Sequence, residues 1–311
     1  MIAFLFPGQG AQEVGMGRDL IGREPGADEL IALASELTGE DAARLCRRGP
    51  PGRLAETRLL QPLLSAVGLA LWSLLERAGV RPDVAAGHSL GEIPALAACG
   101  LAAPEDALRL AARRGQLMHE AAQRSSGAMI AVTGPPSELV ERAVAALSWR
   151  GIVSLAAVNA PTQTTISGDP DLVAEVAATL RAGSEAKITP LRVSGAWHSE
   201  QMEPARQGFA AALAKTPLAP RSEVPIVCNR DGEPTEDAGA VREKLAAQLT
   251  SPIRWDLAMR RMAELGVGDF VEIGPGRVLR GLVRLNLPDP ELRVHNVSDR
   301  RSAERTIDQL S

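Results

Sequence analysis

The chain contains no tyrosine, and only 3% of its 311 residues are aromatic. Flat side chains on which nucleic-acid bases could stack are therefore scarce. Its 34 basic and 38 acidic residues give a net charge of −4, so the positive charge typical of nucleic-acid-binding proteins is missing as well. We expect a protein that does not bind nucleic acid.

Cysteine and histidine are also rare. The three cysteines, Cys46, Cys99 and Cys228, are far apart and odd in number, which excludes a disulfide framework and a Cys-x-x-Cys metal pair. None of the four histidines stands at metal-ligand spacing from another. This composition predicts a cytoplasmic protein without a metal site.

Long hydrophobic runs are absent too. No uninterrupted apolar segment approaches the roughly 20 residues that cross a membrane, and the apolar start Met1–Phe6 is too short and lacks the basic residues of a secretory signal. The 45% hydrophobic content nevertheless suffices for a large buried core. Because 311 residues is long for one compact domain, we expect two domains, or one domain with an insertion.

The segment Gly87-His88-Ser89-Leu90-Gly91 has the Gly-x-Ser-x-Gly pattern of a nucleophile elbow. Small and apolar residues precede it as a strand would, and an apolar run follows it as a helix would. In such a turn the glycines keep Cβ atoms away from the backbone, and the N–H groups at the start of the helix point toward the serine. The pattern favours Ser89 as a nucleophile.

The order of the remaining elements predicts an α/β fold with a mostly parallel sheet and an inserted smaller domain. Residues 128–132, 152–158, 164–167 and 186–191 read as strands, and residues 136–147 and 170–182 as helices. Strand, helix, two strands, helix and strand is the ferredoxin-like order. We therefore assign residues 1–124 and 192–311 to the large domain, and 125–191 to the insertion.

His198 is the best candidate for a base that activates Ser89. It follows a glycine turn and precedes a helix, and only three other histidines compete with it. His88 is next to the serine in sequence, but we expect its side chain to point away across the turn. A structural cap remains the ordinary alternative for His198.

Two sets of arginines border apolar helix faces. Arg113 and Arg114 lie in the middle of a helix predicted over 104–122, where Arg114 borders the apolar stripe and could turn inward while Arg113 faces solvent. In the predicted final helix, Arg277, Arg280 and Arg284 share one face by their i, i+3, i+7 spacing. That face is either simply solvated or a docking surface for an anionic partner.

Several motifs, taken together and in order, resemble those of the malonyl-CoA:acyl-carrier-protein transacylases and the related acyltransferase domains of polyketide synthases. They span nearly the whole chain and are Phe6-Pro7-Gly8-Gln9-Gly10-Ala11-Gln12, Gly87-His88-Ser89-Leu90-Gly91-Glu92, Arg114-Gly115, Asn159-Ala160-Pro161, His198-Ser199, Gln248 with Ser251-Pro252-Ile253-Arg254-Trp255, and Glu272-Ile273-Gly274-Pro275-Gly276. The resemblance implies an α/β-hydrolase-like large domain with an inserted ferredoxin-like domain. This agrees with the fold predicted from the element order.

The resemblance also implies the chemistry of the reacting pair. Ser89 would be the acylated nucleophile, and His198 its general base and later the acid for the departing thiol. The backbone N–H groups of Gln9 and Leu90 would form the oxyanion hole. The backbone carbonyl of Gln248 would orient the histidine, which explains why no acidic member of a triad stands out.

The same resemblance implies how the substrate is held. Arg114 would bind the free carboxylate of a malonyl group, and Asn159 would contribute to substrate binding. Malonyl-CoA would acylate Ser89, and the phosphopantetheine thiol of an acyl carrier protein would then take the acyl group, without a cofactor. Arg277, Arg280 and Arg284 are our candidates for docking that carrier, and we expect a monomer.

Trp197 departs from the pattern of many relatives, which have a smaller residue before the histidine. Because this position borders the acyl pocket, the resemblance implies that a bulky Trp197 disfavours α-branched acyl groups such as methylmalonyl. Strict use of malonyl groups is a hypothesis.

Two other functions fit the same residues. The Ser89–His198 pair could release acyl groups to water as an editing hydrolase, although an arginine in the pocket argues against broad acyl specificity. The chain could also be a non-catalytic carrier-binding protein, although the joint presence of Ser89, His198 and Gln9 argues against that.

Overall fold

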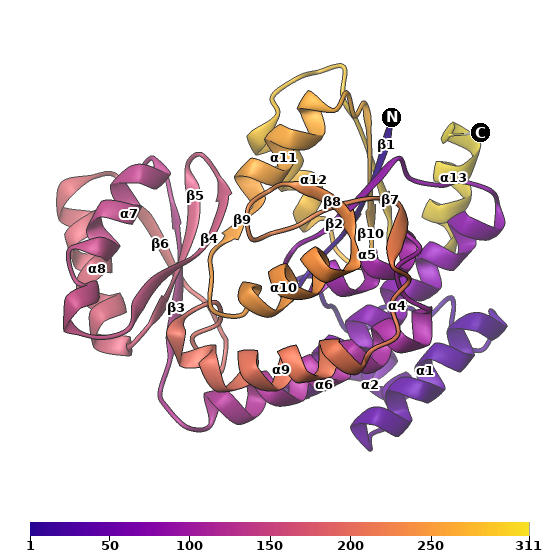
Figure 1. The fold of residues 1–311 in the computed structure, drawn as a ribbon, viewed down its shortest axis with the longest axis horizontal. Helices are drawn as coiled ribbons and strands as arrows, with labels where there is room; N and C mark the ends of the chain where they lie inside the picture. Colours follow the sequence, from indigo (N-terminus) through magenta and orange to yellow (C-terminus); the bar gives the residue numbers. More distant parts are fainter. Residues whose placement is uncertain (311) are drawn as a thin grey trace.

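A six-stranded sheet runs through the larger part of the molecule (Figure 1), and the computed structural model describes residues 1–310. Every neighbouring pair of strands that is bonded in this sheet is parallel except the last, in which β8 runs antiparallel to β7. The strands, in spatial order, are β11 (Arg293–Val297), β10 (Asp269–Ile273), β1 (Ile2–Phe6), β2 (Val84–Gly87), β7 (Arg221–Val227) and β8 (Pro234–Asp237). The predicted α/β class with a mostly parallel sheet is confirmed.

Helices bury both faces of this sheet. Successive side chains of β1 alternate between two cores, with Phe4 and Phe6 in one and Ala3 and Leu5 in the other. The first core is covered by α1 (Pro25–Thr38), α2 (Ala42–Arg48), α3 (Pro51–Leu54), α4 (Thr57–Arg77), α5 (Glu92–Ala98), α6 (Pro104–Ala122), α9 (Glu203–Lys215), α10 (Ala238–Gln248) and α13 (Arg300–Leu310). The second is covered by α11 (Trp255–Glu264) and α12 (Val278–Asn286).

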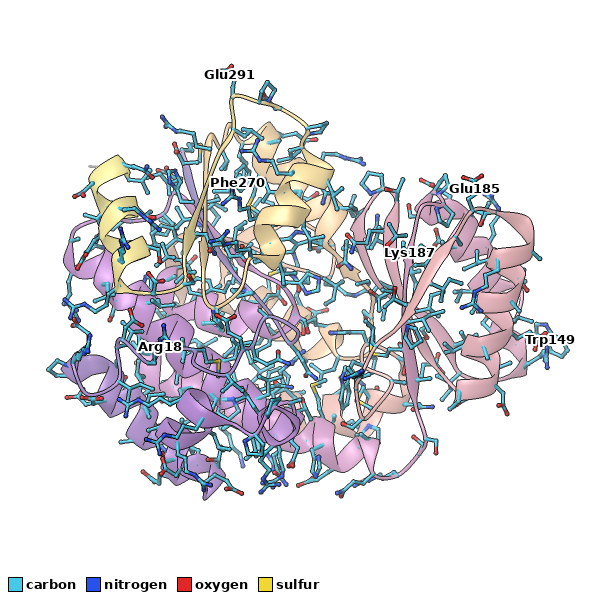
Figure 2. All side chains as sticks on the ribbon, turned by 180° about the vertical axis from the view of Figure 1, so that it is seen from behind. Arg18, Trp149, Glu185, Lys187, Phe270 and Glu291 are labelled. Carbon is cyan, nitrogen blue, oxygen red and sulfur yellow. The ribbon has the colours of Figure 1, made fainter. Side chains whose placement is uncertain are left out.

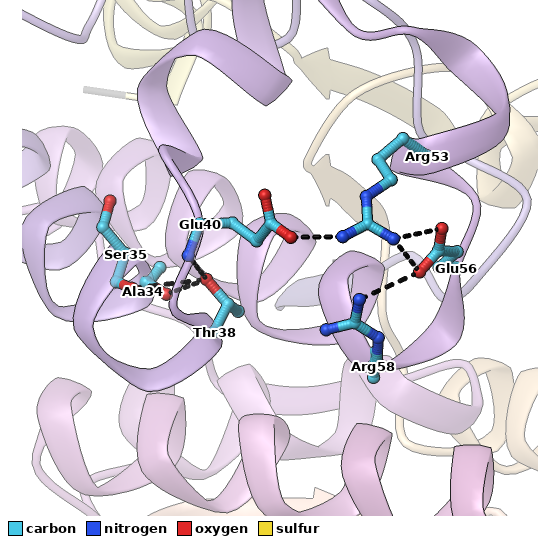
Figure 3. A network of polar contacts seen from close by, with 7 residues as sticks. All are labelled: Ala34, Ser35, Thr38, Glu40, Arg53, Glu56 and Arg58. Atoms are coloured by element: carbon cyan, nitrogen blue, oxygen red, sulfur yellow. Dashed lines mark hydrogen bonds and ion pairs between the residues drawn. The ribbon is translucent and has the colours of Figure 1, made fainter.

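Helix α4 is the central helix of the first core. It is long and apolar enough to cross a membrane, but 83% of its apolar window is buried inside the fold, as in the core helix of a globular domain. Polar contacts surround its first residues (Figure 3): Arg53 bonds Glu56 at 2.7 Å and also pairs with Glu40, while Arg58 lies 3.3 Å from Glu56. Such half-exposed pairs contribute little individually, so the buried apolar face supplies most of the stability of α4.

Helix α6 packs closely against α4 because residue 115 is glycine. A Cβ at Gly115 would lie 2.7 Å from the backbone oxygen of Thr57, closer than real Cβ contacts allow. Any larger residue would push the two helices apart. The close approach brings the neighbouring Arg114 next to Gln61 of α4, to which it donates a hydrogen bond.

A second sheet forms the smaller part of the molecule. Its strands, in spatial order, are β6 (Lys187–Pro190), β3 (Ala128–Thr133), β5 (Gln163–Gly168), β4 (Val153–Ala160) and β9 (Ile253–Arg254). Neighbouring strands among the first four are antiparallel. With α7 (Ser137–Ala145) and α8 (Pro170–Gly183) they follow in the sequence order strand, helix, two strands, helix and strand, which confirms the ferredoxin-like order. The short β9 was not predicted and joins β4 in parallel from outside residues 125–191.

The two faces of this second sheet have different neighbours. Along β3, Ile130 and Val132 pack in the core under α7 and α8, whereas Met129 and Ala131 line a cavity on the opposite face. That cavity-lining face is turned toward the large sheet, and Trp149 projects from the far, outer side (Figure 2). The alternation of one strand thus supplies both a core and a wall of the cavity.

The helix that we expected to be the last in the chain is the last but one within residues 1–310. We expected Arg277, Arg280 and Arg284 in the final helix, but α13 follows α12, and α12 begins only at Val278, so Arg277 is its N-cap. The strand β8 was also missed, because its residues lack an alternating apolar pattern.

Candidate active site

Ser89 occupies a strained turn between β2 and α5, as the elbow pattern predicts. Its φ angle is +53°, and the 3-10 turn Ser89–Gly91 leads directly into α5. A Cβ at Gly87 would lie 1.9 Å from the carbonyl carbon of Gly91, and a Cβ at Gly91 would lie 2.0 Å from the backbone oxygen of Phe6. The two glycines are therefore required for the turn to close against β1.

His198 is hydrogen-bonded to Ser89 on one side and to Gln248 on the other. Its Nε2 lies 2.8 Å from Ser89 Oγ, and its Nδ1 lies 2.9 Å from the backbone oxygen of Gln248. Since a carbonyl oxygen can only accept, Nδ1 carries the proton and Nε2 is free to accept from the serine hydroxyl. The predicted pair is thus in contact, with the histidine in the tautomer of a base.

Burial keeps this histidine neutral. His198 is buried, which lowers its pKa to about 3. The charge of Arg114 adds to the decrease, and the hydrogen bond to Gln248 opposes it. A neutral imidazole at neutral pH is the form that can take a proton from Ser89.

A cavity of about 270 Å³ opens at this pair, between the large sheet and the second sheet. Met129, Ala131 and Ala157 from the second sheet and Leu279 and Leu282 from α12 make much of its wall apolar. The predicted site residues that line it are Gln9, Ser89, Leu90, Arg114, Asn159, Trp197 and His198. The remaining predicted residue, Gln248, lies behind His198.

Arg114 reaches this cavity from α6. It is only 2% exposed, whereas its neighbour Arg113 is exposed, as the helix pattern suggested. Its Nη2 donates to Ser89 Oγ at 3.1 Å and to Gln248 Oε1 at 2.8 Å, and its Nη1 donates to Gln61 Oε1 at 2.9 Å. Burial lowers the pKa of Arg114 to about 10, and the nearby Glu92 charge opposes this decrease. All three hydrogen-bond partners of the guanidinium are neutral.

A buried chain of polar residues leads from Arg114 to Gln9. Gln61 donates from Nε2 to Thr57 Oγ1 at 2.9 Å, and Thr57 donates to Gln9 Oε1 at 3.2 Å. Gln61 and Thr57 were not predicted as site residues. The only signal was a glutamine within a helix of leucines, which a buried partner explains.

Glu92 and Asn229 form a second unpredicted group beneath the elbow. Asn229 Oδ1 accepts from the backbone N–H of Ser89, and its Nδ2 donates to the backbone oxygen of Gly87, both at 2.7 Å. Glu92 accepts from the backbone N–H of Asn229 at 2.7 Å and from Gln248 Nε2. Burial raises the pKa of Glu92, while these N–H donors and the Arg114 charge favour its carboxylate form.

His88 faces the cavity, although we expected its side chain to point away across the turn. Its Nε2 lies 2.8 Å from Asn159 Oδ1, its ring lies 5.4 Å from the ring of Trp255, and it lines the same cavity. The expectation was wrong because the tight turn at Ser89 directs residue 88 toward the second sheet rather than outward. Burial lowers the pKa of His88, so it binds Asn159 as a neutral ring.

Three arginines in and before α12 lie close in sequence to residues that line the cavity. Val278, Leu279 and Leu282 line the cavity, while Arg277, Arg280 and Arg284 are exposed. No group of three or more His, Cys, Asp or Glu side chains is arranged to hold a metal within residues 1–310.

The family model described as an acyl transferase domain matches residues 3–303. The chain belongs to the acyl transferase domain family. This acyl transferase domain is 36% identical over 311 residues to the malonyl CoA-acyl carrier protein transacylase of Bacillus subtilis, covering 99% of this chain and 97% of that protein. It is 39% identical over 289 residues to the polyketide biosynthesis protein ThaF of Burkholderia thailandensis, covering 93% of this chain but 24% of ThaF.

Solved structures resemble this acyl transferase domain equally well. A malonyl-transacylase in complex with its type II polyketide synthase acyl carrier protein superposes with a TM-score of 0.92 at 35% identity, covering 99% of each chain. A transacylase structure from Streptococcus pneumoniae superposes with a TM-score of 0.91 at 36% identity, covering 99% of this chain and all of that one. Both sequence and structure therefore match over nearly the whole of this chain.

Proposed function

We propose that this protein is a malonyl-CoA:acyl carrier protein transacylase that works through an acyl-enzyme at Ser89. Relatives that match over nearly the whole chain are named for this activity. The observation that carries the mechanism is the position of Ser89 Oγ, 2.8 Å from His198 Nε2 and 3.1 Å from Arg114 Nη2. A nucleophile with a base on one side and a guanidinium on the other suits a thioester whose acyl group ends in a carboxylate.

In the first half-reaction, His198 Nε2 takes the proton of Ser89 while Oγ attacks the thioester carbonyl of malonyl-CoA. The negative charge that develops on the carbonyl oxygen would be bound by the backbone N–H groups of Gln9 and Leu90, both of which line the cavity. Such a donor typically contributes about 3 kcal/mol to transition-state stabilisation. The C–S bond breaks, and the protonated His198 gives its proton to the leaving coenzyme A thiolate.

In the second half-reaction, the same groups act in reverse on a different thiol. His198 takes a proton from the phosphopantetheine thiol of the carrier, whose sulfur attacks the Ser89 ester. The collapse of the tetrahedral intermediate forms the new thioester and returns the proton to Ser89 Oγ. Nothing is oxidised or reduced: the malonyl group passes from the coenzyme A thioester to Ser89 and then to the carrier thiol, and the coenzyme A thiol is released.

Arg114 would select acyl groups with a carboxylate. A buried guanidinium whose partners are all neutral is left without a counterion in contact, which is costly. A malonyl carboxylate would supply that counterion and could accept two parallel N–H bonds. An acyl group that ends in a methyl group would bury the same charge without a partner, and is therefore selected against.

Asn159 and Trp197 would shape the rest of the acyl and pantetheine path. Asn159 is held by His88 and bonded through its backbone oxygen to Asn286 of α12 at 2.7 Å, so it links the second sheet to the large domain. Trp197 is 4% exposed and lines the cavity, where its indole limits the space beside the acyl chain.

The carrier protein would dock over α12. Arg277, Arg280 and Arg284 present three positive charges beside the cavity-lining residues of the same helix, where an acidic carrier could place its phosphopantetheine arm into the site. All reacting side chains come from one chain, so we propose that the monomer is sufficient for activity.

The rival function is hydrolysis of the same acyl-enzyme. It differs in one measurable outcome, which is the fate of malonyl groups when no carrier is present. The purified protein, supplied with malonyl-CoA and a phosphopantetheinylated carrier, should produce malonyl-carrier much faster than free malonate. Malonate release that is equally fast with and without the carrier would identify a hydrolase instead.

A further inference from the structure

Glu92 connects the serine turn, the arginine and the histidine orienter, although it touches none of the reacting atoms. Its two carboxyl oxygens accept from the backbone N–H of Asn229 and from Gln248 Nε2. Gln248 then accepts from Arg114 Nη2 at 2.8 Å through Oε1, while its Nε2 also donates to the backbone oxygen of Ser89 at 3.0 Å. The side chains of Glu92, Gln248 and Arg114 are each 2% exposed or less, so water cannot replace a hydrogen bond that is lost among them.

The carboxylate dictates which way the Gln248 amide faces. Both oxygens of Glu92 lie against N–H donors, and a protonated Glu92 would place its own O–H against one of them. Only an amide whose NH2 points to Glu92 and to the Ser89 carbonyl leaves Oε1 free to face Arg114. The reversed amide would set NH2 against the guanidinium, with two donors facing each other and no acceptor between them.

We propose that Glu92 is a positioning residue that orients Arg114 for the acyl carboxylate by fixing the side-chain amide of Gln248. This inference rests on the proposed transacylase function. It separates two roles of Gln248: the backbone carbonyl orients His198, and the side-chain amide orients Arg114. Disturbing Glu92 should therefore impair selection of the carboxylate more than it impairs the chemistry at Ser89.

The test compares acylation of Ser89 by malonyl-CoA and by acetyl-CoA in Glu92→Gln, using rapid quenching and intact-protein mass spectrometry. A glutamine offers one acceptor to two donors, so the Gln248 amide loses its fixed direction and Arg114 shifts. The expected result is that the preference for malonyl-CoA over acetyl-CoA falls by about 10-fold or more, because small displacements of a substrate-holding group carry large costs. An unchanged preference, whatever the absolute rates, overturns the proposal.

Two variants separate positioning from simple loss of structure. Glu92→Asp keeps both acceptor oxygens, and should retain the malonyl preference even where its overall rate is lower. Glu272→Gln is the matched control, because Glu272 is also fully buried and accepts the backbone N–H groups of Leu279 and Arg280 at 2.9 Å. It should leave the preference unchanged, and an equal loss in Glu272→Gln contradicts the proposal.

Should Glu92→Gln not fold, Gln248→Met gives the same information. It removes the amide but keeps the backbone carbonyl that binds His198, so the malonyl preference should fall as in Glu92→Gln. A preserved preference in Gln248→Met overturns the inference. The wild type, measured alongside, distinguishes failure of the proposed function from failure of the Glu92 inference. If the wild type is not acylated at all, the proposed function is wrong as well. If it is acylated, a preserved preference refutes only the role of Glu92.

Discussion

His198 Nε2 lies 2.8 Å from Ser89 Oγ, and these two residues are also the only non-glycine positions in residues 1–310 with a positive φ, at 61° and 53°. Such backbone conformations cost about 1 to 3 kcal/mol each, and they persist only where the surrounding structure enforces them. Here the Asn229 bonds hold the Ser89 turn and the Gln248 carbonyl holds the imidazole. The strain is therefore concentrated on the pair of groups that we propose to react.

Replacing Arg114 should remove the selection for a carboxylate. In Arg114→Met, we expect the ratio of malonyl-CoA to acetyl-CoA acylation rates to fall by roughly 100-fold. This is about 2.8 kcal/mol, within the 2 to 5 kcal/mol that truncating a buried charge pair costs. Competition between the two thioesters, read by mass spectrometry, measures the ratio. Arg113→Met on the same helix is the control, because Arg113 is exposed; a similar loss in both variants would refute the assignment.

The acid limb of the pH profile should depend on Arg114. Burial is the main cause that lowers the pKa of His198 to about 3, and the Arg114 charge adds to it. Removing that charge raises the pKa, so the protonated and inactive imidazole appears at a higher pH in Arg114→Met than in the wild type. Acetyl-CoA acylation rates against pH, with circular dichroism to confirm folding, provide the check. An acid limb at the same or lower pH would contradict the proposed electrostatic coupling.

Trp197 should restrict the size of the acyl group. In Trp197→Ser, the rate with methylmalonyl-CoA relative to malonyl-CoA should rise by about 10-fold, since one methyl group in a fitted pocket accounts for 1 to 3 kcal/mol of discrimination. The control is Trp149→Ser, because Trp149 is 81% exposed on the outer side of the second sheet (Figure 2). Equal use of both thioesters by the wild type would already disprove the restriction.

Charge reversal on α12 should weaken binding of the carrier protein without affecting acylation of Ser89 by malonyl-CoA. The double variant Arg280→Glu with Arg284→Glu should raise the KM for the carrier several-fold, while Ser89 acylation by malonyl-CoA stays unchanged. Arg301→Glu with Arg305→Glu on α13 is the matched control, because both residues are exposed and this helix lies apart from the second sheet (Figure 1). An unchanged carrier KM in the α12 variant would exclude this face as the docking site.

The elements that the sequence predicted well are those with a local pattern. The Ser89 turn depends on glycines two residues away on each side, and the ferredoxin-like order depends on short strands and helices that follow one another within residues 125–191. The contact of His198 with Ser89 spans 109 positions, and it was inferred from the glycine turn before His198, the helix after it and the small number of histidines. The small number of histidines thus helped to identify a partner of Ser89 that no local pattern indicates.

The network around Gln248 could not be predicted in the same way. Glu92 and Gln248 are 156 positions apart, and Asn229 and Ser89 are 140 apart, so neither pair leaves a periodic signal. Glu92 stands at the start of an apolar helix, where an acidic residue is ordinary and suggests only an interaction with the helix dipole. Its burial, and the role we infer from it, follow from how α5, α10 and the loop after β7 meet beneath the elbow.

The most direct test of the account is the intact mass of the protein after brief exposure to malonyl-CoA. We predict that the wild type gains the mass of one malonyl group, that peptide mapping places it on Ser89, and that adding a phosphopantetheinylated carrier removes it and yields malonyl-carrier. Ser89→Ala should gain nothing while remaining folded. Transfer to the carrier without a covalent intermediate, or a malonyl group on any residue other than Ser89, would contradict the mechanism.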